Sequence, residues 1–130
     1  MPFMTMVHDE DPKEKLLKNL KSLGEIDVFN NQVLVAVYIR PQKTKSGIYL
    51  SDRTTDEDRF QSKVGVIAKL GPTAFDDPTG VWFKNADLKI GDWVFYRASD
   101  GWSITIDNIL CRVMDDTAIR GRIPQPDAVW

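Results

Sequence analysis

Residues 32–41, "QVLVAVYIRP", decide the fold class of this 130-residue chain. The run is rich in β-branched residues and closes with Pro41, a pattern that is typical of a β-strand. A second run of the same kind, "KVGVIAKLGP" at residues 63–72, ends in Gly-Pro. From about Val28 onward, we therefore expect extended chain rather than helix.

Shorter β-rich segments follow, separated by glycine and by polar turns without a helical pattern between them. They are "GDWVFYRA" (91–98), "WSITID" (102–107), "ILCRVM" (109–114) and "AIRGRI" (118–123). Five or six short strands predict an all-β fold, a small β-barrel or sandwich. Two long connections, about residues 43–63 and about residues 72–90, interrupt the pattern. Because loops of this length are uncommon in compact domains and are usually functional, we expect a binding module.

The N-terminal stretch "DPKEKLLKNLKSLG" predicts one short amphipathic helix over about residues 11–23. Asp11 is suited to the N-cap, Pro12 to the first helical position and Glu14 to a capping box. Leu16, Leu17, Leu20 and Leu23 share one face, and Gly24 supplies a stop. The helix either packs on its own domain or is a docking arm for another subunit. We divide the chain into an N-terminal extension (1–27), a barrel domain (28–123) and an extended tail (124–130).

Composition and charge restrict the function. The chain is 42% hydrophobic and 28% charged with a net charge of −2, which is typical of a globular domain without general attraction for nucleic acid or anionic membranes. One Cys and one His cannot form a structural zinc site, and Cys111 lies in a segment that is expected to be a buried strand. The acidic residues at 56–58 and at 115–116 are interpreted as solvated charges. We expect no catalytic residue, metal or cofactor, and a cytoplasmic protein without a signal peptide or membrane span.

In order and spacing, the segments resemble the GroES-type co-chaperonin (10 kDa chaperonin) family. The resemblance covers about residues 28–123 and is carried by "VLVAVYIRP", "KTKSGIYL", "KVGVIAKLGP", "KIGDWVFY", "ITIDN" and "LCRVMDDTAIRGRI". "TKSGIYL" and "KIGDWVFY" are its most specific pieces. The resemblance implies a GroES-like β-barrel that assembles into a seven-membered ring, caps a GroEL-type chaperonin and assists protein folding. A member encoded by a phage would act in the host cytoplasm.

The resemblance also implies partner-binding residues. The segment Gly47, Ile48, Tyr49 and Leu50 in the mobile-type loop 43–63 would insert between two helices of the chaperonin, with Ile48 and Leu50 as anchors. The alternative is a strand edge that packs on its own barrel. A secondary contact is expected in the roof-type loop 72–90, at Val81, Trp82 and Phe83. The resemblance further implies that the "QVLVAV" strand of one copy pairs with "AIRGRI" of the next, each having an open edge.

Three features depart from a plain co-chaperonin: the N-terminal extension, the tail ending in Trp130, and the aromatic segment "GVWFKN" at 80–85. They leave open a phage virion role, in which the barrel is a capsid decoration or cement protein bound to the major capsid protein. The helix and the tail would then be clamps.

Two further functional hypotheses have less support from the sequence. A single-stranded nucleic acid could stack on Trp82, Trp93, Tyr96 and Trp102, but the acidic balance disfavours this reading. The GroES-like domain of zinc dehydrogenases is excluded because its zinc ligands and cofactor domain are missing.

Overall fold

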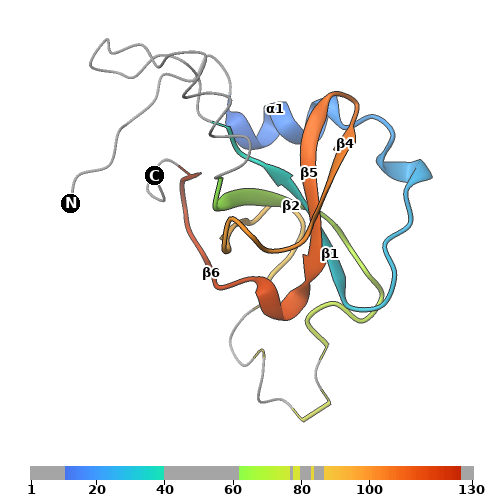
Figure 1. Ribbon diagram of the computed structural model, residues 1–130, viewed down its shortest axis with the longest axis vertical. Helices are drawn as coiled ribbons and strands as arrows, with labels where there is room; N and C mark the ends of the chain where they lie inside the picture. The colour runs from blue at the N-terminus through green and yellow to red at the C-terminus, as the bar shows by residue number, and fades with distance from the viewer. Residues whose placement is uncertain (1–10, 40–61, 77, 80–82, 84–86, 127–130) are drawn as a thin grey trace, which may run out of the picture.

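The computed structural model of the chain describes residues 11–39, 62–76, 78–79, 83 and 87–126. In these residues one α-helix precedes six strands, which form a single antiparallel sheet in the order β4-β5-β1-β2-β3-β6. Figure 1 shows α1 beside the sheet. The helix is α1 (Pro12–Asn19), and the strands are β1 (Gln32–Val37), β2 (Val64–Leu70), β3 (Trp93–Phe95), β4 (Trp102–Ile106), β5 (Ile109–Asp115) and β6 (Gly121–Arg122). Two short 3-10 turns, η1 (Leu23–Glu25) and η2 (Asp116–Ala118), complete the described elements. The predicted all-β fold with one short N-terminal helix is confirmed.

Strand β1 lies in the middle of the sheet. It pairs with β2 along one edge and with β5 along the other. Its side chains alternate between two apolar clusters, and both faces of the strand are buried. The expectation that β1 keeps an open edge for a neighbouring copy is therefore wrong. A strand that is apolar on both faces is stabilised most in the centre of a sheet, and the edge strands of the described sheet are β4 and β6.

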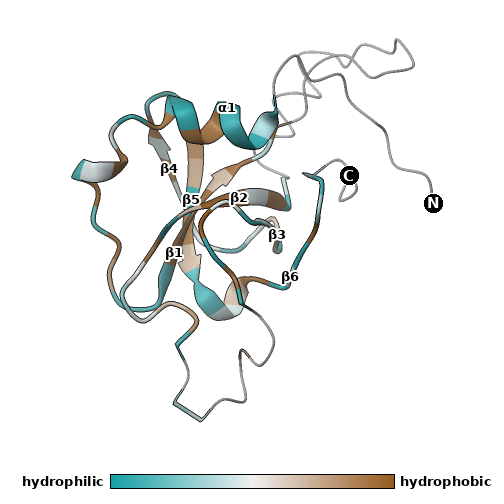
Figure 2. Cartoon of the chain, turned by 180° about the vertical axis from the view of Figure 1, so that it is seen from behind, coloured by the Kyte–Doolittle hydropathy of each residue, from teal (hydrophilic) through white to brown (hydrophobic). Residues whose placement is uncertain are grey.

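Each face of the sheet carries its own apolar cluster. The first cluster holds Leu20, Leu34, Ala36, Tyr38, Val64, Val66, Ala68, Trp93, Ile106 and Cys111. The second holds Val33, Val35, Ile67, Val94, Tyr96 and Met114. Figure 2 shows hydrophobic residues along the central strands, whereas α1 mixes hydrophobic and hydrophilic residues. The helix therefore has an apolar side available to cover the first cluster.

The start of α1 follows the sequence prediction, but its end does not. The Asp11 side chain caps the helix by accepting a hydrogen bond from the Lys13 N–H (3.0 Å), and Pro12 opens the first turn. The helix ends at Asn19 rather than near residue 23, because Leu20 leaves helical geometry with φ −85° and ψ 73°. This change of direction places Leu20 in the core. Burial of one leucine thus outweighs a further turn of exposed helix.

The segment that contains α1 is attached to its own sheet. The Ser22 N–H and Oγ both donate to the Asp107 carboxylate, at 2.8 and 3.0 Å. Lys69 Nζ on β2 donates to the carbonyls of Leu23 (2.8 Å) and Ile26. These bonds join the N-terminal segment to the β4–β5 turn and to β2. Of the two readings for the helix, packing within its own chain is the one that the structure shows.

Candidate functional site

The ends of segment 40–61 are held by neighbouring strands. The Tyr38 N–H donates to the Val64 carbonyl (3.0 Å), so the chain that continues from β1 lies beside the chain that enters β2. The predicted binding residues Gly47, Ile48, Tyr49 and Leu50 lie outside the described residues. The structure therefore describes the base of this loop and not its contact tripeptide.

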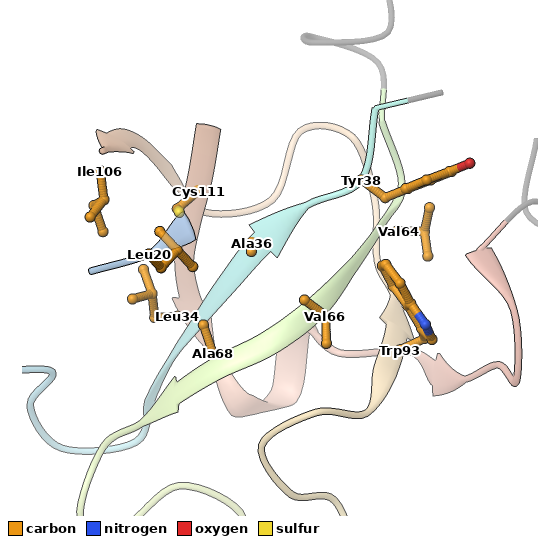
Figure 3. Packing of buried hydrophobic residues seen from close by; sticks show 10 residues of the cluster. All are labelled: Leu20, Leu34, Ala36, Tyr38, Val64, Val66, Ala68, Trp93, Ile106 and Cys111. Atoms are coloured by element: carbon orange, nitrogen blue, oxygen red, sulfur yellow. The ribbon is translucent and has the colours of Figure 1, made fainter. Parts of the chain in front are cut away.

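The base of this loop is a packed aromatic cluster. The rings of Tyr38 and Trp93 meet edge to face, with centroids 5.6 Å apart and an interplanar angle of 78°. Val64 lies beside them, and the Tyr38 hydroxyl extends away from the cluster (Figure 3). The buried Ser62 Oγ donates to the carbonyls of Tyr38 (2.7 Å) and Val64 (3.2 Å). Aromatic packing and a buried hydroxyl thus fix the two ends of the loop relative to each other.

Gly65, from the "KVGV" motif, permits the close contact of β1 and β2 next to this base. A Cβ at position 65 would lie 2.3 Å from Val35 Cγ1 and 2.5 Å from the Ala36 carbonyl oxygen. The second of these is a backbone atom, which cannot move aside without displacing β1. The glycine of the motif is therefore required by the spacing of the two strands that carry the loop.

The second loop, about residues 72–90, leaves from the opposite end of the β1–β2 ladder. Its base contains Phe75 in a left-handed conformation (φ 59°), whose N–H donates to Asp116 Oδ2 (3.0 Å). The Phe75 ring meets the Phe83 ring edge to face, with centroids 5.4 Å apart. Of the predicted secondary contact residues, Phe83 is described and half-buried, whereas Val81 and Trp82 lie outside the described residues.

Sequence reasoning missed the role of Asp116. The interpretation of residues 115–116 as solvated charges holds for Asp115 but is wrong for Asp116, which is only 3% exposed. Asp116 follows β5 directly and turns inward at η2, where neutral donors from two other segments meet its carboxylate. The sequence signal that could have indicated a buried Asp116 is its position after the apolar run 109–114, but the exposed Asp115 follows the same run. Two adjacent aspartates thus have opposite environments.

Two of the aromatic residues considered for base stacking are buried. Trp93 is 4% exposed and Tyr96 is buried, so both belong to the core. Trp102 is 77% exposed, and Trp82 lies outside the described residues. Trp93 and Tyr96 therefore cannot serve as stacking platforms, and that part of the nucleic-acid reading is wrong.

The titratable core groups are unsuited to nucleophilic chemistry. Burial raises the pKa of the Cys111 thiol to about 11, with a smaller contribution from the Asp107 charge. Burial also raises the Tyr96 pKa above its ordinary value, and the nearby Arg112 only partly opposes this shift. Both groups therefore remain protonated at neutral pH. Within the described ranges, no cluster of three His, Cys, Asp or Glu residues could bind a metal ion. The same ranges contain no helix that is long and apolar enough to cross a membrane.

The described residues form a small β domain whose antiparallel sheet carries two loops at opposite ends of its β1–β2 ladder. The family model described as the chaperonin 10 kDa subunit (Cpn10) matches residues 25–123, which include all six strands. A search of curated proteins found no significant match. The chain belongs to the Cpn10 family, whose members are co-chaperonins rather than enzymes.

Membership of this family bears on the virion alternative. That reading depended in part on α1 as a clamp for a lattice, yet the leucines of α1 and of the following turn pack on the core of the same chain. The C-terminal tail gives little evidence for or against a clamp on a capsid. Pro126 is buried, and residues 127–130 lie outside the described residues. The family match supports a general co-chaperonin role, and the packing of α1 on its own core removes one argument for a capsid clamp.

Proposed function

We propose that this chain is the subunit of an oligomeric lid that binds a GroEL-type chaperonin through Ile48 and Leu50 and assists protein folding in the cytoplasm. The family match over both strands that flank segment 40–61 carries this proposal. The packed base of the loop supports it, because fixed loop ends reduce the entropy that the apolar motif loses when it docks. Gly47 and Tyr49 complete the contact segment, with Tyr49 on the opposite side from the two anchors.

A single loop is expected to bind weakly. Burial of Ile48 and Leu50 contributes about 1.5–3 kcal/mol each, and ordering of the surrounding residues costs several kcal/mol. A ring of seven copies, the family arrangement, compensates for this cost because every contact after the first is intramolecular. Weak individual contacts and strong collective binding would also allow release when the chaperonin changes state.

Assembly of the ring is proposed to use the β6 edge. Strand β6 pairs with β3 on one side, and its other side is the end of the described sheet. Unpaired backbone groups of an edge strand readily accept a strand from another chain. Strand β1 is not available for this purpose, so the partner segment in the next copy lies elsewhere.

The central test replaces both anchors in the full-length protein. Ile48→Ser with Leu50→Ser removes the apolar contact, and we expect nucleotide-dependent co-sedimentation with a GroEL-type chaperonin to fall by about a hundredfold or more in affinity. Analytical ultracentrifugation should show an unchanged oligomer. The matched control is Tyr49→Ser, which removes the residue on the other side and is expected to weaken binding much less.

Two outcomes would contradict the proposal. The first is wild-type co-sedimentation by the double variant, which would exclude Ile48 and Leu50 as anchors. The second is an equal loss of binding in the Tyr49→Ser control, which would exclude the two-sided arrangement of the segment.

A further inference from the structure

The buried carboxylate of Asp116 joins three segments that are distant in sequence. Asn31, in the turn before β1, donates from Nδ2 to Asp116 Oδ1 (3.0 Å). Phe75, in the second loop, donates from its backbone N–H to Asp116 Oδ2 (3.0 Å). The Asp116 N–H in turn donates to the Asn31 carbonyl (3.0 Å). Each oxygen of a side chain that is almost fully buried therefore has one neutral donor from a different segment.

Burial of this carboxylate costs free energy, which calls for a specific explanation. A charged group removed from water loses hydration that neutral donors replace only in part. The same site also holds Phe75 with φ 59°, a conformation that bulky residues rarely adopt. Because the Phe75 N–H is bonded to Asp116, the carboxylate stabilises the strained residue directly. Two unfavourable features thus occur in contact with each other.

The strained conformation determines where the Phe75 ring lies. Phe75 meets Phe83 edge to face, at an interplanar angle of 86°. Phe83 is the described member of the proposed secondary contact. Along the chain, Asp116 is the first residue of η2. Two residues after η2, strand β6 begins at the edge of the sheet. Asp116 therefore connects the aromatic pair, through its bond from Phe75, with the short segment that leads to the edge strand.

We propose that Asp116 is a positioning residue that fixes the Phe75–Phe83 pair relative to β6. The two surfaces that would meet other protein chains are thereby presented in one geometry. The inference rests on the proposed function in one respect, the identity of the protein chains that those two surfaces contact. The positioning itself is a property of the single chain and can be measured without a chaperonin.

The hydrogen-bonding pattern allows a sharp test by exchange of side chains. Asp116→Ala removes both acceptors. Asn31→Asp alone places two carboxylates against each other and also disrupts the site. When Asn31→Asp and Asp116→Asn are combined, the new amide can donate to the new carboxylate, while its oxygen still accepts from the Phe75 N–H. The double variant should therefore restore the hydrogen bond between the side chains at positions 31 and 116 that Asn31→Asp removes.

The measurement is amide hydrogen exchange of the full-length protein by NMR, with the Phe75 N–H as reporter. The Gly71 N–H, which donates to the Gln32 carbonyl (2.8 Å), is the reference in the same turn. We expect Asp116→Ala and Asn31→Asp each to accelerate exchange of Phe75 relative to Gly71 by about tenfold. In the double variant, the ratio should return to near the wild-type value. If Asp116→Ala does not fold, the comparison of Asn31→Asp alone with Asn31→Asp plus Asp116→Asn still provides the test.

Three results would overturn the proposal: unchanged exchange of the Phe75 N–H in both disrupted variants, equal acceleration at Phe75 and Gly71, or a double variant no slower in exchange than Asn31→Asp alone. Equal acceleration would mean that Asp116 contributes only to global stability. Because no chaperonin is present, these results are independent of whether Ile48 and Leu50 are anchors.

Discussion

The two loops leave opposite ends of the same ladder from bases of opposite chemistry. The base of segment 40–61 is aromatic and aliphatic, with Trp93, Tyr38 and Val64 in the core and one buried hydroxyl. The base of the 72–90 loop depends on a buried carboxylate and a left-handed phenylalanine. An apolar base derives its stability from area removed from water, whereas a polar base derives orientation from directional bonds. The first base should therefore control whether the chain folds, and the second where its loop points.

The largest effect is expected at the apolar base. Trp93→Ala removes a buried indole and its edge contact with Tyr38, so the free energy of unfolding should fall by about 3–5 kcal/mol. Urea denaturation followed by circular dichroism at fixed protein concentration measures this change. Phe75→Ala, which removes the half-buried ring of the other aromatic pair, should cost clearly less. The exposed Trp102 serves as control, since Trp102→Ala should change stability by no more than about 0.5 kcal/mol. Equal losses for Trp93→Ala and Phe75→Ala would refute the contrast between the bases.

A smaller effect is expected at the single polar contact of the apolar base. Ser62→Ala removes the buried hydroxyl that donates to the Tyr38 carbonyl, and we expect a loss of about 1–3 kcal/mol in unfolding free energy. Ser103→Ala, at an exposed position of β4, is the matched control and should be close to neutral. If both substitutions had the same effect in urea denaturation, the hydroxyl would have no part in closing the loop base.

The smallest effect concerns a third attachment, which is fully exposed. The bonds from Ser22 hold the pKa of Asp107 below its ordinary value. The stabilisation is therefore complete above the ordinary carboxyl pKa of about 4 and is lost as the pH falls through the lower folded value. Asp107→Asn should lower the unfolding midpoint slightly at pH 7, where the charged carboxylate contributes, and change it little in strong acid, so that the acid dependence becomes flatter. Asn tolerates the left-handed φ of 51° at this position, so the turn itself should persist. An unchanged acid profile would show that Asp107 does not hold the N-terminal segment.

The sequence predicts what depends on short-range pattern. The β-branched run of β1, the Asp11 cap and the proline at the start of α1 all follow from local chemistry. Position within the sheet does not follow from local chemistry: the sequence predicts a free edge for β1, yet the strand is central. The predicted end of α1 is also wrong, because Leu20 packs into a core that no local signal describes. The prediction of a solvated Asp116 fails for the same reason, since its hydrogen-bond donors come from residues 31 and 75.

The bond between the Tyr38 N–H and the Val64 carbonyl has a consequence for how such a protein can diverge. The ladder itself closes the loop, so the length of the intervening segment has little influence on the stability of the sheet. Doubling the length of a flexible loop costs only about 0.6 kcal/mol in closure entropy. Insertions, deletions and wholesale replacement between residues 40 and 61 are therefore inexpensive in folding terms. A lineage can change the partner that it recognises while it keeps the same scaffold.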